Sequence, residues 1–367
     1  MAFPLNSGTG DVVGVYVPAD PDAVQWGWVA PGGTPPVAKV RPGELLTVDT
    51  ISHEGILADQ GRDPVAFFGR YGIGRGELLD DTVSLAGSSR RHDPASDGPH
   101  VLTGPIWVEG AEPGDVVTVE VIHLALRVPY GVVSNRHGLG ALPGEMPEPD
   151  PSTGRAIPVV CRFASVFWRD GGCYAVVHPP SDPRTNTRPA GGLPLPLRPF
   201  LGLVAVAPGD RPAHSVPPGP HGGNLDVRLL GMGSRLHLPV RVEGALVQVG
   251  DPHFAQGDGE VALTALEGPL RAVLRIELAK AAQPSWDLPF GETDDAWLLL
   301  GLHEDVDEAV RIATRAGIAL VTERTGVDRA TAYAWLSTAA DLSVSQVVDE
   351  VKGVHLSVPK RWLRLET

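Results

Sequence analysis

Residues 243–267 read EGALVQVGDPHFAQGDGEVALTALE, and this stretch decides how the rest of the chain is interpreted. Its centre, residues 250–260, combines carboxyl, imidazole and amide side chains with interleaved glycines. Its flanks, residues 245–249 and 261–266, run apolar or alternate as buried strands do. We therefore expect the polar centre on a glycine-rich connection between two strands held in a core, where glycine lets a ligand approach the backbone closely.

The polar side chains of this centre allow two interpretations. They are Asp251, His253, Gln256, Asp258 and Glu260. Carboxylates and an imidazole in one tight connection suit a divalent metal or a general acid/base pair. Asp-Gly and Gly-Asp pairs are also ordinary turn chemistry, in which aspartate caps its own backbone. A turn requires neither histidine nor glutamine, so this stretch alone leaves both a functional site and a structural turn open.

The composition favours a β-rich fold and argues against some classes of partner. The 367 residues can bury a large core, as one domain or as two closely joined lobes. The 44 glycines and 36 prolines are spread among apolar runs, which indicates many turns. The net charge of -14, from 30 basic and 44 acidic side chains, argues against nucleic acid and anionic membranes as partners.

Further features predict a cytoplasmic protein. No apolar run approaches the roughly 18 residues that a membrane-spanning helix needs, and the first residues, MAFP, do not begin a signal peptide. Cys161 and Cys173 have no CxxC spacing, so we expect two free thiols.

A turn-and-strand unit occurs twice in the first third of the chain. RPGELLTVD (41–49) parallels EPGDVVTVE (112–120), and in each the Pro-Gly pair predicts a type II turn before a strand. Between them, residues 51–99 are expected to form a long loop, in which GIGRG (72–76) lacks the strand-then-helix context of a dinucleotide fingerprint. Proline and glycine predict a second long loop over 125–157, of the kind that is usually functional.

Further strands are predicted where residues alternate or run apolar. They cover residues 101–108, 116–124, 159–166, 173–178, 236–242 and 270–278. After about residue 284 helical spacing predicts helices over 305–316 and 329–342, with Asp328 as the N-cap of the second. A short third helix over 343–352 and a strand over 354–358 are predicted to follow. We therefore divide the chain into a β-rich catalytic body, 1–283, and an α/β C-terminal segment, 284–367, packed on it as structure or as an oligomer contact.

Several stretches resemble one known family in the same order. GDPHFAQGDGE (250–260) is similar to the family hallmark Gly-Asp-x-His-x-x-Gln-Gly-Asp-Gly-Glu. Further matching segments are HVLTGPIWVEGAEPGD (100–115), PFLGLVAVAP (199–208), HGGNLDVR (221–228) and LPVRVEGALVQVGD (238–251). The chain thereby resembles the acetamidase/formamidase family from about residue 40 to residue 361.

This resemblance implies a fold and an activity. The fold would be mainly β with α+β decoration, a β-sandwich-like body to which the helical C-terminal segment adds. The activity would be that of an amidase, a hydrolase that converts a short aliphatic amide (acetamide or formamide class) to carboxylate and ammonia. Members form homo-oligomers, dimers or larger. SHEGILADQGRD (52–63) replaces a shorter family stretch and the 125–150 loop is distinctive, so the substrate can differ from that of the family.

The remaining residues narrow the chemistry by which an amide can be cleaved. The four lysines do not adjoin a serine-rich glycine loop, no Gly-x-Ser-x-Gly elbow occurs, and neither cysteine has a setting that lowers a thiol pKa. Water activated by a metal remains, and so does a metal-free carboxylate mechanism. Two further functions stay open: hydrolysis of another small C–N compound, cyclic or urea-like, and small-ligand binding by a β-rich protein without turnover.

We expect three separated segments to form the site. The predicted ligands of a divalent metal, with zinc as the expected ion, are His100, Asp226, Asp251 and His253. The predicted catalytic residues are Glu260 as general base, Asp258 and Asn224. The predicted substrate-binding residues are Gly222 and Gly223, whose N–H groups would hold an oxyanion, with Gln256 and His137. A left-handed turn at Gly222-Gly223-Asn224 and a surface position for His137 are the structural alternatives.

Overall fold

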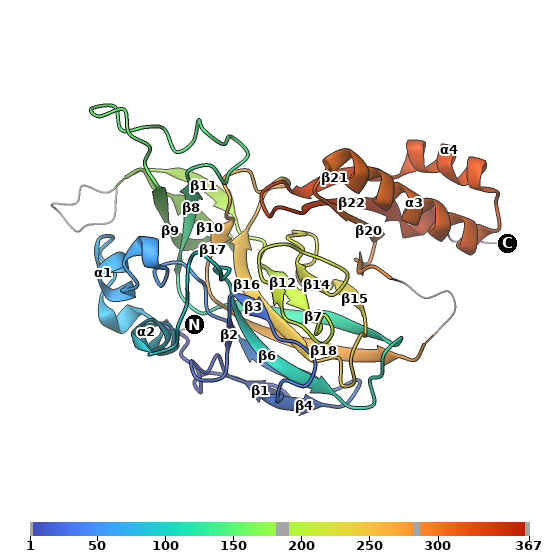
Figure 1. The fold of residues 1–367 in the computed structure, drawn as a ribbon, viewed down its shortest axis with the longest axis horizontal. Coiled ribbons are helices and arrows are strands. Elements are labelled where there is room, and N and C mark those ends of the chain that lie inside the picture. The colour runs from blue at the N-terminus through green and yellow to red at the C-terminus, as the bar shows by residue number, and fades with distance from the viewer. Residues whose placement is uncertain (1–2, 181–190, 282–286, 364–367) are drawn as a thin grey trace.

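Two large β-sheets packed face to face make up most of the molecule, and helices lie at its periphery (Figure 1). The computed structural model describes residues 3–180, 191–281 and 287–363. The predicted fold class, a mainly β, β-sandwich-like body with a helical C-terminal segment, is confirmed. No helix within these ranges is long and apolar enough to cross a membrane.

The first sheet has nine strands and passes from the body into the C-terminal segment. In spatial order they are β1 (Val15–Val17), β5 (Leu45–Asp49), β18 (Leu270–Ala279), β7 (Val116–Leu126), β15 (Arg235–Pro239), β19 (Phe290–Glu292), β20 (Ala296–His303), β22 (Lys352–Pro359) and β21 (Asp341–Gln346). Strand β15 pairs with β7 on one side and with β19 on the other. One sheet therefore spans the proposed division at 283/284, which remains a prediction about domains.

The second sheet has eleven strands and contains the polar centre of the chain. Its main path is β11 (Leu193–Pro196), β10 (Gly172–Val177), β9 (Val159–Arg169), β8 (Tyr130–Arg136), β17 (Leu266–Glu267), β16 (Val247–Ala255), β12 (Phe200–Ala205) and β14 (Gly222–Asn224). Strand β6 (Val101–Val108) pairs with β16, β2 (Gln25–Trp26) and β4 (Ala38–Val40). A separate pair is formed by β3 (Trp28–Val29) and β13 (Ala213–His214).

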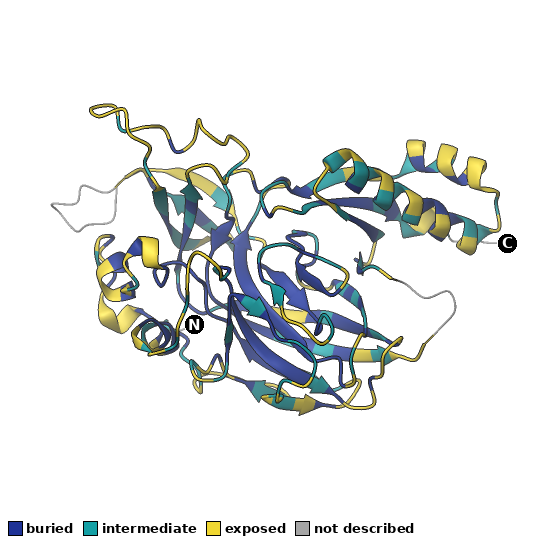
Figure 2. Cartoon of the chain, viewed as in Figure 1, coloured by how far each residue is buried: buried dark blue, intermediate teal, exposed yellow. Residues whose placement is uncertain are grey.

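The main hydrophobic core lies between the two sheets. Leu46, Val119 and Leu274 of the first sheet belong to the same buried cluster as Val249 and Phe254 of the second. Burial of each such side chain contributes about 1.5–3 kcal/mol relative to exposure. Figure 2 shows the central strands buried and the outer faces of the helices exposed. The predicted strands 101–108, 116–124, 159–166, 173–178, 236–242 and 270–278 are confirmed to within about three residues at each end.

Both predicted Pro-Gly turns lead directly into paired strands. Gly43 and Gly114 have φ angles of 87° and 96°, a region that glycine adopts without steric cost. Their N–H groups donate to the carbonyls of Ile276 and Val240. Strands β5 and β7 follow and lie on either side of β18.

Short helices occupy part of the stretch 51–99, so the prediction of a long loop there is wrong. These elements are η1 (Ala58–Gln60), α1 (Pro64–Gly69), η2 (Arg75–Glu77) and α2 (Asp80–Gly87). Asp63 caps α1 by accepting the N–H of Ala66. Helices α1 and α2 are about two turns long, which is too short to produce a clear helical period of apolar residues in the sequence. Strand β8 likewise occupies part of 125–157, and the connection that remains is residues 137–157.

Two helices pack on strands β20 and β22 of the C-terminal segment (Figure 1). α3 (Val306–Thr325) begins after the N-cap Asp305 and extends beyond its predicted end to Thr325, with Gly326 as its C-cap. α4 (Arg329–Ala339) begins after Asp328, which caps it as predicted. The predicted helix over 343–352 is wrong, because residues 341–346 pair with β22 as strand β21. The strand predicted over 354–358 lies within β22, and η3 (Lys360–Trp362) follows it.

Candidate active site

Strand β16 presents two of the predicted ligands on one face of the sheet. The sequence placed Asp251 and His253 on a connection, but β16 continues through both to Ala255, so that expectation is wrong. The strand continues because β12 pairs with it as far as His253 and β17 as far as Ala255. Residues two apart in a strand point to the same side. Asp251 also has a φ of 48°, which makes the strand locally irregular at this point.

The glycine-rich turn lies after β16, and Glu260 ends it. Glu260 has a φ of 45°, its side chain is buried, and its Oε2 has no hydrogen-bond partner among the described residues. The strand predicted over 261–266 is wrong: residues 261–264 are turns and bends, and only Leu266–Glu267 is extended. Glu260 therefore belongs to an irregular segment between two strands that both contribute to the site.

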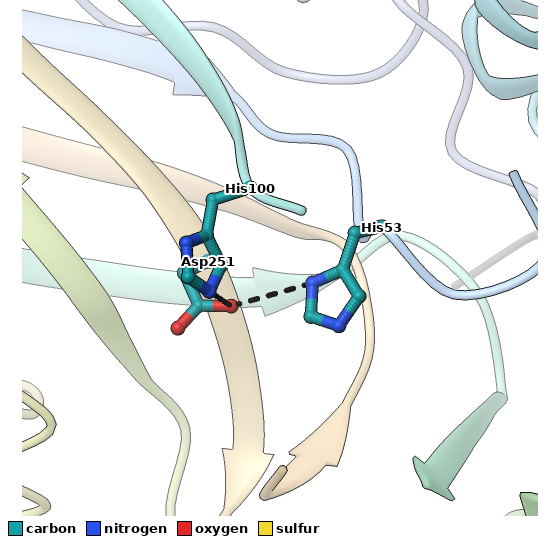
Figure 3. A group of neighbouring side chains, drawn as sticks. All are labelled: His53, His100 and Asp251. Carbon is teal, nitrogen blue, oxygen red and sulfur yellow. Dashed lines mark ion pairs between the residues drawn. The ribbon is translucent and has the colours of Figure 1, made fainter. Parts of the chain in front are cut away.

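Two imidazole rings converge on one oxygen of Asp251 (Figure 3). His53 Nδ1 lies 3.6 Å and His100 Nε2 lies 3.7 Å from Asp251 Oδ1, and all three side chains are buried. His53 follows β5, His100 precedes β6, and Asp251 lies in β16. We call these three residues the histidine–aspartate cluster.

Neighbouring groups fix which nitrogen of each ring faces Asp251. His100 Nδ1 lies 3.1 Å from the carbonyl oxygen of Ser215, which can only accept, so the proton is on Nδ1 and Nε2 has a free lone pair. His53 Nε2 lies 3.4 Å from Glu54 Oε1, which favours a proton on Nε2 and leaves Nδ1 facing Asp251. Burial lowers the pKa of His100 to about 4, so this ring is neutral at neutral pH.

The histidine–aspartate cluster fits a divalent ion. Two imidazole nitrogens and a carboxylate oxygen are zinc ligands, and two ligands of one tetrahedral zinc lie about 3.4 Å apart, close to the separations observed here. His53 Nδ1 and Asp251 Oδ1 have no hydrogen-bond partner among the described residues, which is rare for buried polar atoms. Burial opposes a charge on His53, but its hydrogen bond to Glu54 and the charges of nearby carboxylates raise its pKa. The surroundings thus stabilise a cation at this point.

His253 lies behind this cluster, between two carboxylates. Its Nε2 is 2.9 Å from Asp251 Oδ2 and 3.2 Å from Glu267 Oε1, and its Nδ1 is 3.0 Å from Gln256 Oε1. Burial lowers the pKa of His253, but the charges of Asp251 and Glu267 outweigh burial and raise the pKa well above its usual value. The protonated ring pairs through Nε2 with the charges of Asp251 and Glu267 and donates from Nδ1 to Gln256 Oε1, so it holds Asp251 and Gln256 in place.

A group of buried carboxyls lies on the other side of His253. One ligand atom each of Asp226, His253 and Glu260 lies within 4.8 Å of the others. Burial, reinforced by neighbouring carboxylates, raises the pKa of both Asp226 and Glu260 well above the usual value. Burial also raises the pKa of Asp349 to about 7, against the neighbouring polar groups of Asp226 and Asn224, which lower it. Several carboxyls here therefore keep a proton at a pH at which exposed carboxyls are ionised.

Gly202 in β12 makes room for these side chains. A Cβ at this position would lie 2.5 Å from Asp226 Oδ1, 2.6 Å from Asp251 Oδ2 and 2.7 Å from His253 Cε1. Those separations are too short for real contacts, so the hydrogen atom of glycine allows the clusters to pack against the strand.

A cavity of about 490 Å³ opens onto the buried polar residues. Seven buried polar residues that line it are called its floor: His53, His100, Asn224, Asp251, Glu260, Glu267 and Asp349. Leu57, Leu139, Leu263 and Val348 contribute apolar walls. The volume is in the range of small-molecule sites. The floor combines the histidine–aspartate cluster, which fits a metal ion, with carboxyls that keep a proton.

Of the predicted site residues, His100, Asp251, Asn224 and Glu260 are brought together at the floor, and Asp226 and His253 lie directly behind. The four predicted metal ligands nevertheless do not form one group: His100 groups with Asp251, Asp226 groups with His253, and Asp251 and His253 group with Glu267. Gln256 positions His253 and donates to the carbonyl of Asp226 instead of lining the cavity.

Other predicted residues lie away from the floor. Asp258 makes two hydrogen bonds, of 2.7 and 2.9 Å, to the Arg228 guanidinium. His137 is exposed on the turn after β8 and does not line the cavity. Gly222 and Gly223 have φ angles of 87° and 85° in β14. The N–H of Gly222 donates to the carbonyl of Gly219, so it is not free to hold an oxyanion. The oxyanion role of Gly223 stays a prediction.

Sequence reasoning missed four residues of the site. They are His53, Glu54, Glu267 and Asp349. His53 and Glu54 lie in the SHEG stretch, where an adjacent histidine and glutamate were an available signal. Asp349 lies between β21 and β22, in a stretch that was predicted to be helical and structural.

Comparisons with known proteins agree with the resemblance seen in the sequence. The model of the Acetamidase/Formamidase family matches residues 194–290. The chain is 31% identical over 198 residues to a formamidase of Methylophilus methylotrophus and 32% identical over 202 residues to an acetamidase of Mycolicibacterium smegmatis. Each match covers 44% of this chain, and 47% and 49% of the relatives. The chain therefore spans about half the length of the curated relatives it matches.

Solved structures match over a greater length. An acetamidase from Bacillus halodurans has a TM-score of 0.72 and 26% identity, over 96% of this chain and 100% of its own. An acetamidase from Yersinia enterocolitica has a TM-score of 0.71 and 25% identity, over 97% of this chain and 94% of its own. A gamma lactamase from Delftia acidovorans, at 22% identity and a TM-score of 0.54, shares the fold alone. The resemblance to the acetamidase/formamidase family is thereby confirmed.

Proposed function

Because the chain resembles the acetamidase/formamidase family, we propose that it is an amidase that hydrolyses a linear amide of the acetamide or formamide class to carboxylate and ammonia. The observation that supports this most is at the cavity floor, where nitrogens of His53 and His100 face one oxygen of Asp251. Glu260 lines the same cavity. A site for a Lewis acid and a proton-transferring carboxyl therefore lie in one place.

We propose that His53, His100 and Asp251 hold a divalent ion, zinc by the types of ligand. A divalent ion bound there would lower the pKa of water from 15.7 to about 7 and polarise a carbonyl. The Ser215 carbonyl and Glu54 orient the two rings, and His253 holds Asp251. His253 and Asp226, which the sequence placed among the ligands, are assigned here to positioning and charge balance.

Glu260 is proposed as the general acid and base. It would take a proton from the water whose oxygen attacks the carbonyl carbon of the amide. It would then deliver that proton to the amide nitrogen as the C–N bond breaks, which yields the carboxylic acid and ammonia. Transfer of the acid's proton to ammonia or solvent then gives the carboxylate. Only the ionised carboxylate can accept this proton, and a divalent ion at the neighbouring histidine–aspartate cluster would favour that form against the burial that raises the pKa of Glu260. General acid–base catalysis typically contributes about 10²–10⁴-fold.

Asn224 is proposed to bind the substrate. Its side chain is buried and lines the cavity, and its Oδ1 has no hydrogen-bond partner among the described residues. A free amide oxygen suits the N–H₂ group of a primary amide. Asp258 is proposed to fix the turn before Glu260 through its pairing with Arg228.

Ammonia release from formamide and acetamide tests this proposal, with the metal content of the purified protein measured on the same sample. We expect release that is lost on chelation and restored by a divalent metal. Full activity without metal would leave amide hydrolysis in place but overturn the metal assignment. Ligand-induced thermal shifts without any ammonia would indicate a binding protein, and release from cyclic or urea-like compounds alone would move the substrate to another C–N class.

Assembly and location stay predictions. We propose a homo-oligomer, and light scattering that shows only a 38.7 kDa species at micromolar concentration would overturn it. The cytoplasmic location rests on the sequence features alone, and fractionation of the cells that make the protein would test it.

A further inference from the structure

The cavity is much larger than the amides named in the proposed function. Acetamide has four non-hydrogen atoms and occupies on the order of 100 Å³, given about 30 Å³ for a water molecule in the liquid. The cavity has a volume of about 490 Å³. A substrate of the size of acetamide would leave most of this space to water, so the cavity has room for an acyl group several times larger.

Part of the wall away from the floor is apolar. Leu57, Leu139, Leu263 and Val348 line the cavity, with proline and alanine side chains beside them. These four come from three separate parts of the chain and from the C-terminal segment. Such a wall binds hydrocarbon, since each buried methylene contributes about fourfold in affinity.

Leu263 is held in an unusual backbone conformation in this wall. Its φ is 98°, a region that leucine rarely adopts and glycine adopts at no steric cost. It lies three residues after Glu260, and both side chains line the cavity. Strained residues of this kind cluster at functional sites. The presence of leucine at a position that favours glycine indicates that its side chain contributes to substrate binding in the cavity, next to Glu260, the proposed acid and base.

The charges around the cavity disfavour an anionic substrate. Four aspartates and three glutamates line it, against one guanidinium, that of Arg136. Arg136 already hydrogen-bonds both oxygens of Asp59, at 2.6 and 3.2 Å. The pKa values of Glu260, Glu267 and Asp349 are raised, Asp59 pairs with Arg136, and one divalent ion would offset Asp251. The acidic side chains of Asp97 and Glu350 then remain without a cation among the described residues of the lining. No described residue of the lining therefore offers a free cation to a carboxylate on the substrate.

Resting on the proposed function, we infer that the preferred substrate is an uncharged primary amide with an apolar acyl group larger than acetyl, of the size of hexanamide or benzamide. Amides with a second, ionised carboxylate are rejected. The carboxylate formed in the reaction is repelled by the same acidic lining, which favours its release.

The test is kcat/KM of the metal-loaded enzyme on formamide, acetamide, butyramide, hexanamide, benzamide and succinamate, the anionic counterpart of butyramide. We expect hexanamide or benzamide to exceed acetamide at least tenfold, and succinamate to fall at least a hundredfold below butyramide. A preference for acetamide over all longer amides, or turnover of succinamate equal to that of butyramide, would overturn the inference and leave the proposed amidase activity intact. Failure to release ammonia from any of the six amides would overturn the proposed function itself.

Two exposed leucines of one connection supply a matched pair of variants. Leu139 lines the cavity and Leu142 does not, and their exposed fractions are 54% and 49%. We expect Leu139→Ser to lower the ratio of hexanamide to acetamide turnover about fivefold or more, and Leu142→Ser to leave that ratio unchanged. Leu263→Gly, which relieves the backbone strain while it removes the side chain, should lower the ratio further. Equal ratios in Leu139→Ser, Leu263→Gly and the parent protein would overturn the assignment of this wall.

Discussion

Replacing Gly202 by alanine would test the geometry of the site without removing a single polar group. The new Cβ would lie 2.5 Å from Asp226 Oδ1, 2.6 Å from Asp251 Oδ2 and 2.7 Å from His253 Cε1. Ordinary contacts begin near 3.4 Å, so these groups must move apart from β12 by about 0.7–0.9 Å, the difference between 3.4 Å and these separations. All three side chains are buried and in contact with one another, so no flexible end can give way.

The expected magnitude follows from that displacement. Overpacking a filled interior costs about 1–3 kcal/mol, and a misplacement of about 1 Å in an active site costs about 10²-fold in rate. We expect Gly202→Ala to lower the free energy of unfolding by about 1–3 kcal/mol and kcat/KM for the best amide by about a hundredfold. Denaturant unfolding and ammonia release measure the two effects.

Gly257→Ala is the matched control, since it lies on the turn after β16 and a Cβ there would meet no atom within 4 Å. This variant should keep the free energy of unfolding of the parent protein, and its kcat/KM should lie within about threefold of the parent value. Gly202→Ala with the rate and the stability of the parent protein would show that Asp226, Asp251 and His253 do not pack against β12 as described, and would refute the reasoning.

Three further predictions concern the roles of single residues. Glu260→Gln should lower kcat by about 10²-fold or more with little change in melting temperature, because the proton acceptor is lost without leaving a space; parent-level turnover at full metal occupancy would remove Glu260 from the mechanism. His53→Ala should lower the metal content at a fixed free-metal concentration, by about tenfold or more in affinity, whereas His137→Ala should not change it; equal metal content in both would exclude His53 as a ligand. Hydrogen bonds from His237 and Lys360 lower the pKa of Glu292 from 4.5 to about 2. This depressed pKa contributes stability that is fully present above about pH 4.5 and is lost as the pH falls toward 2. The contribution is at most roughly 3 kcal/mol and is smaller where solvent screens the pair. Between pH 5 and pH 3 the free energy of unfolding, measured with denaturant, should therefore fall less in Glu292→Gln than in the parent protein, and equal falls would contradict the assignment.

The sequence was sufficient for those parts of the site that local patterns encode. Asp251, His253 and Glu260 lie in one short stretch with an unusual combination of side chains, so they could be identified from the sequence alone. His100 could be placed because it precedes a clearly apolar strand, β6. Such residues stand out because neither a turn nor a core requires their side chains.

The remaining site residues depend on contacts between distant segments. His53 faces Asp251 although 198 residues separate them, as 251 minus 53, and nothing in the SHEG stretch specifies that partner. Asp258 lies in a stretch whose composition suits a catalytic site, but its pairing with Arg228 turns its side chain away from the cavity floor. Spacing along the chain does not encode which carboxyl of a glycine-rich turn points inward.

The errors in secondary structure have a related cause. Residues 343–346 pair with β22 and so form a strand, although local spacing predicted a helix. Tertiary pairing overrides weak local preference in such short segments. Helices α1 and α2 were missed for the opposite reason, because six and eight residues are too few to show a helical period against a glycine-rich background.

The distribution of the site along the chain also has a consequence in time. His53 and Asp349 line the same cavity although 296 residues separate them, as 349 minus 53. A ribosome adds roughly 5–20 residues per second, so about 15–60 s pass between the synthesis of the first of these residues and that of the last. All three residues of the histidine–aspartate cluster have been synthesised once β16 is complete, before the chain has Asp349 or strands β21 and β22. A chain stalled before residue 349 would therefore contain the whole histidine–aspartate cluster but lack Val348, Asp349 and Glu350 of the cavity lining.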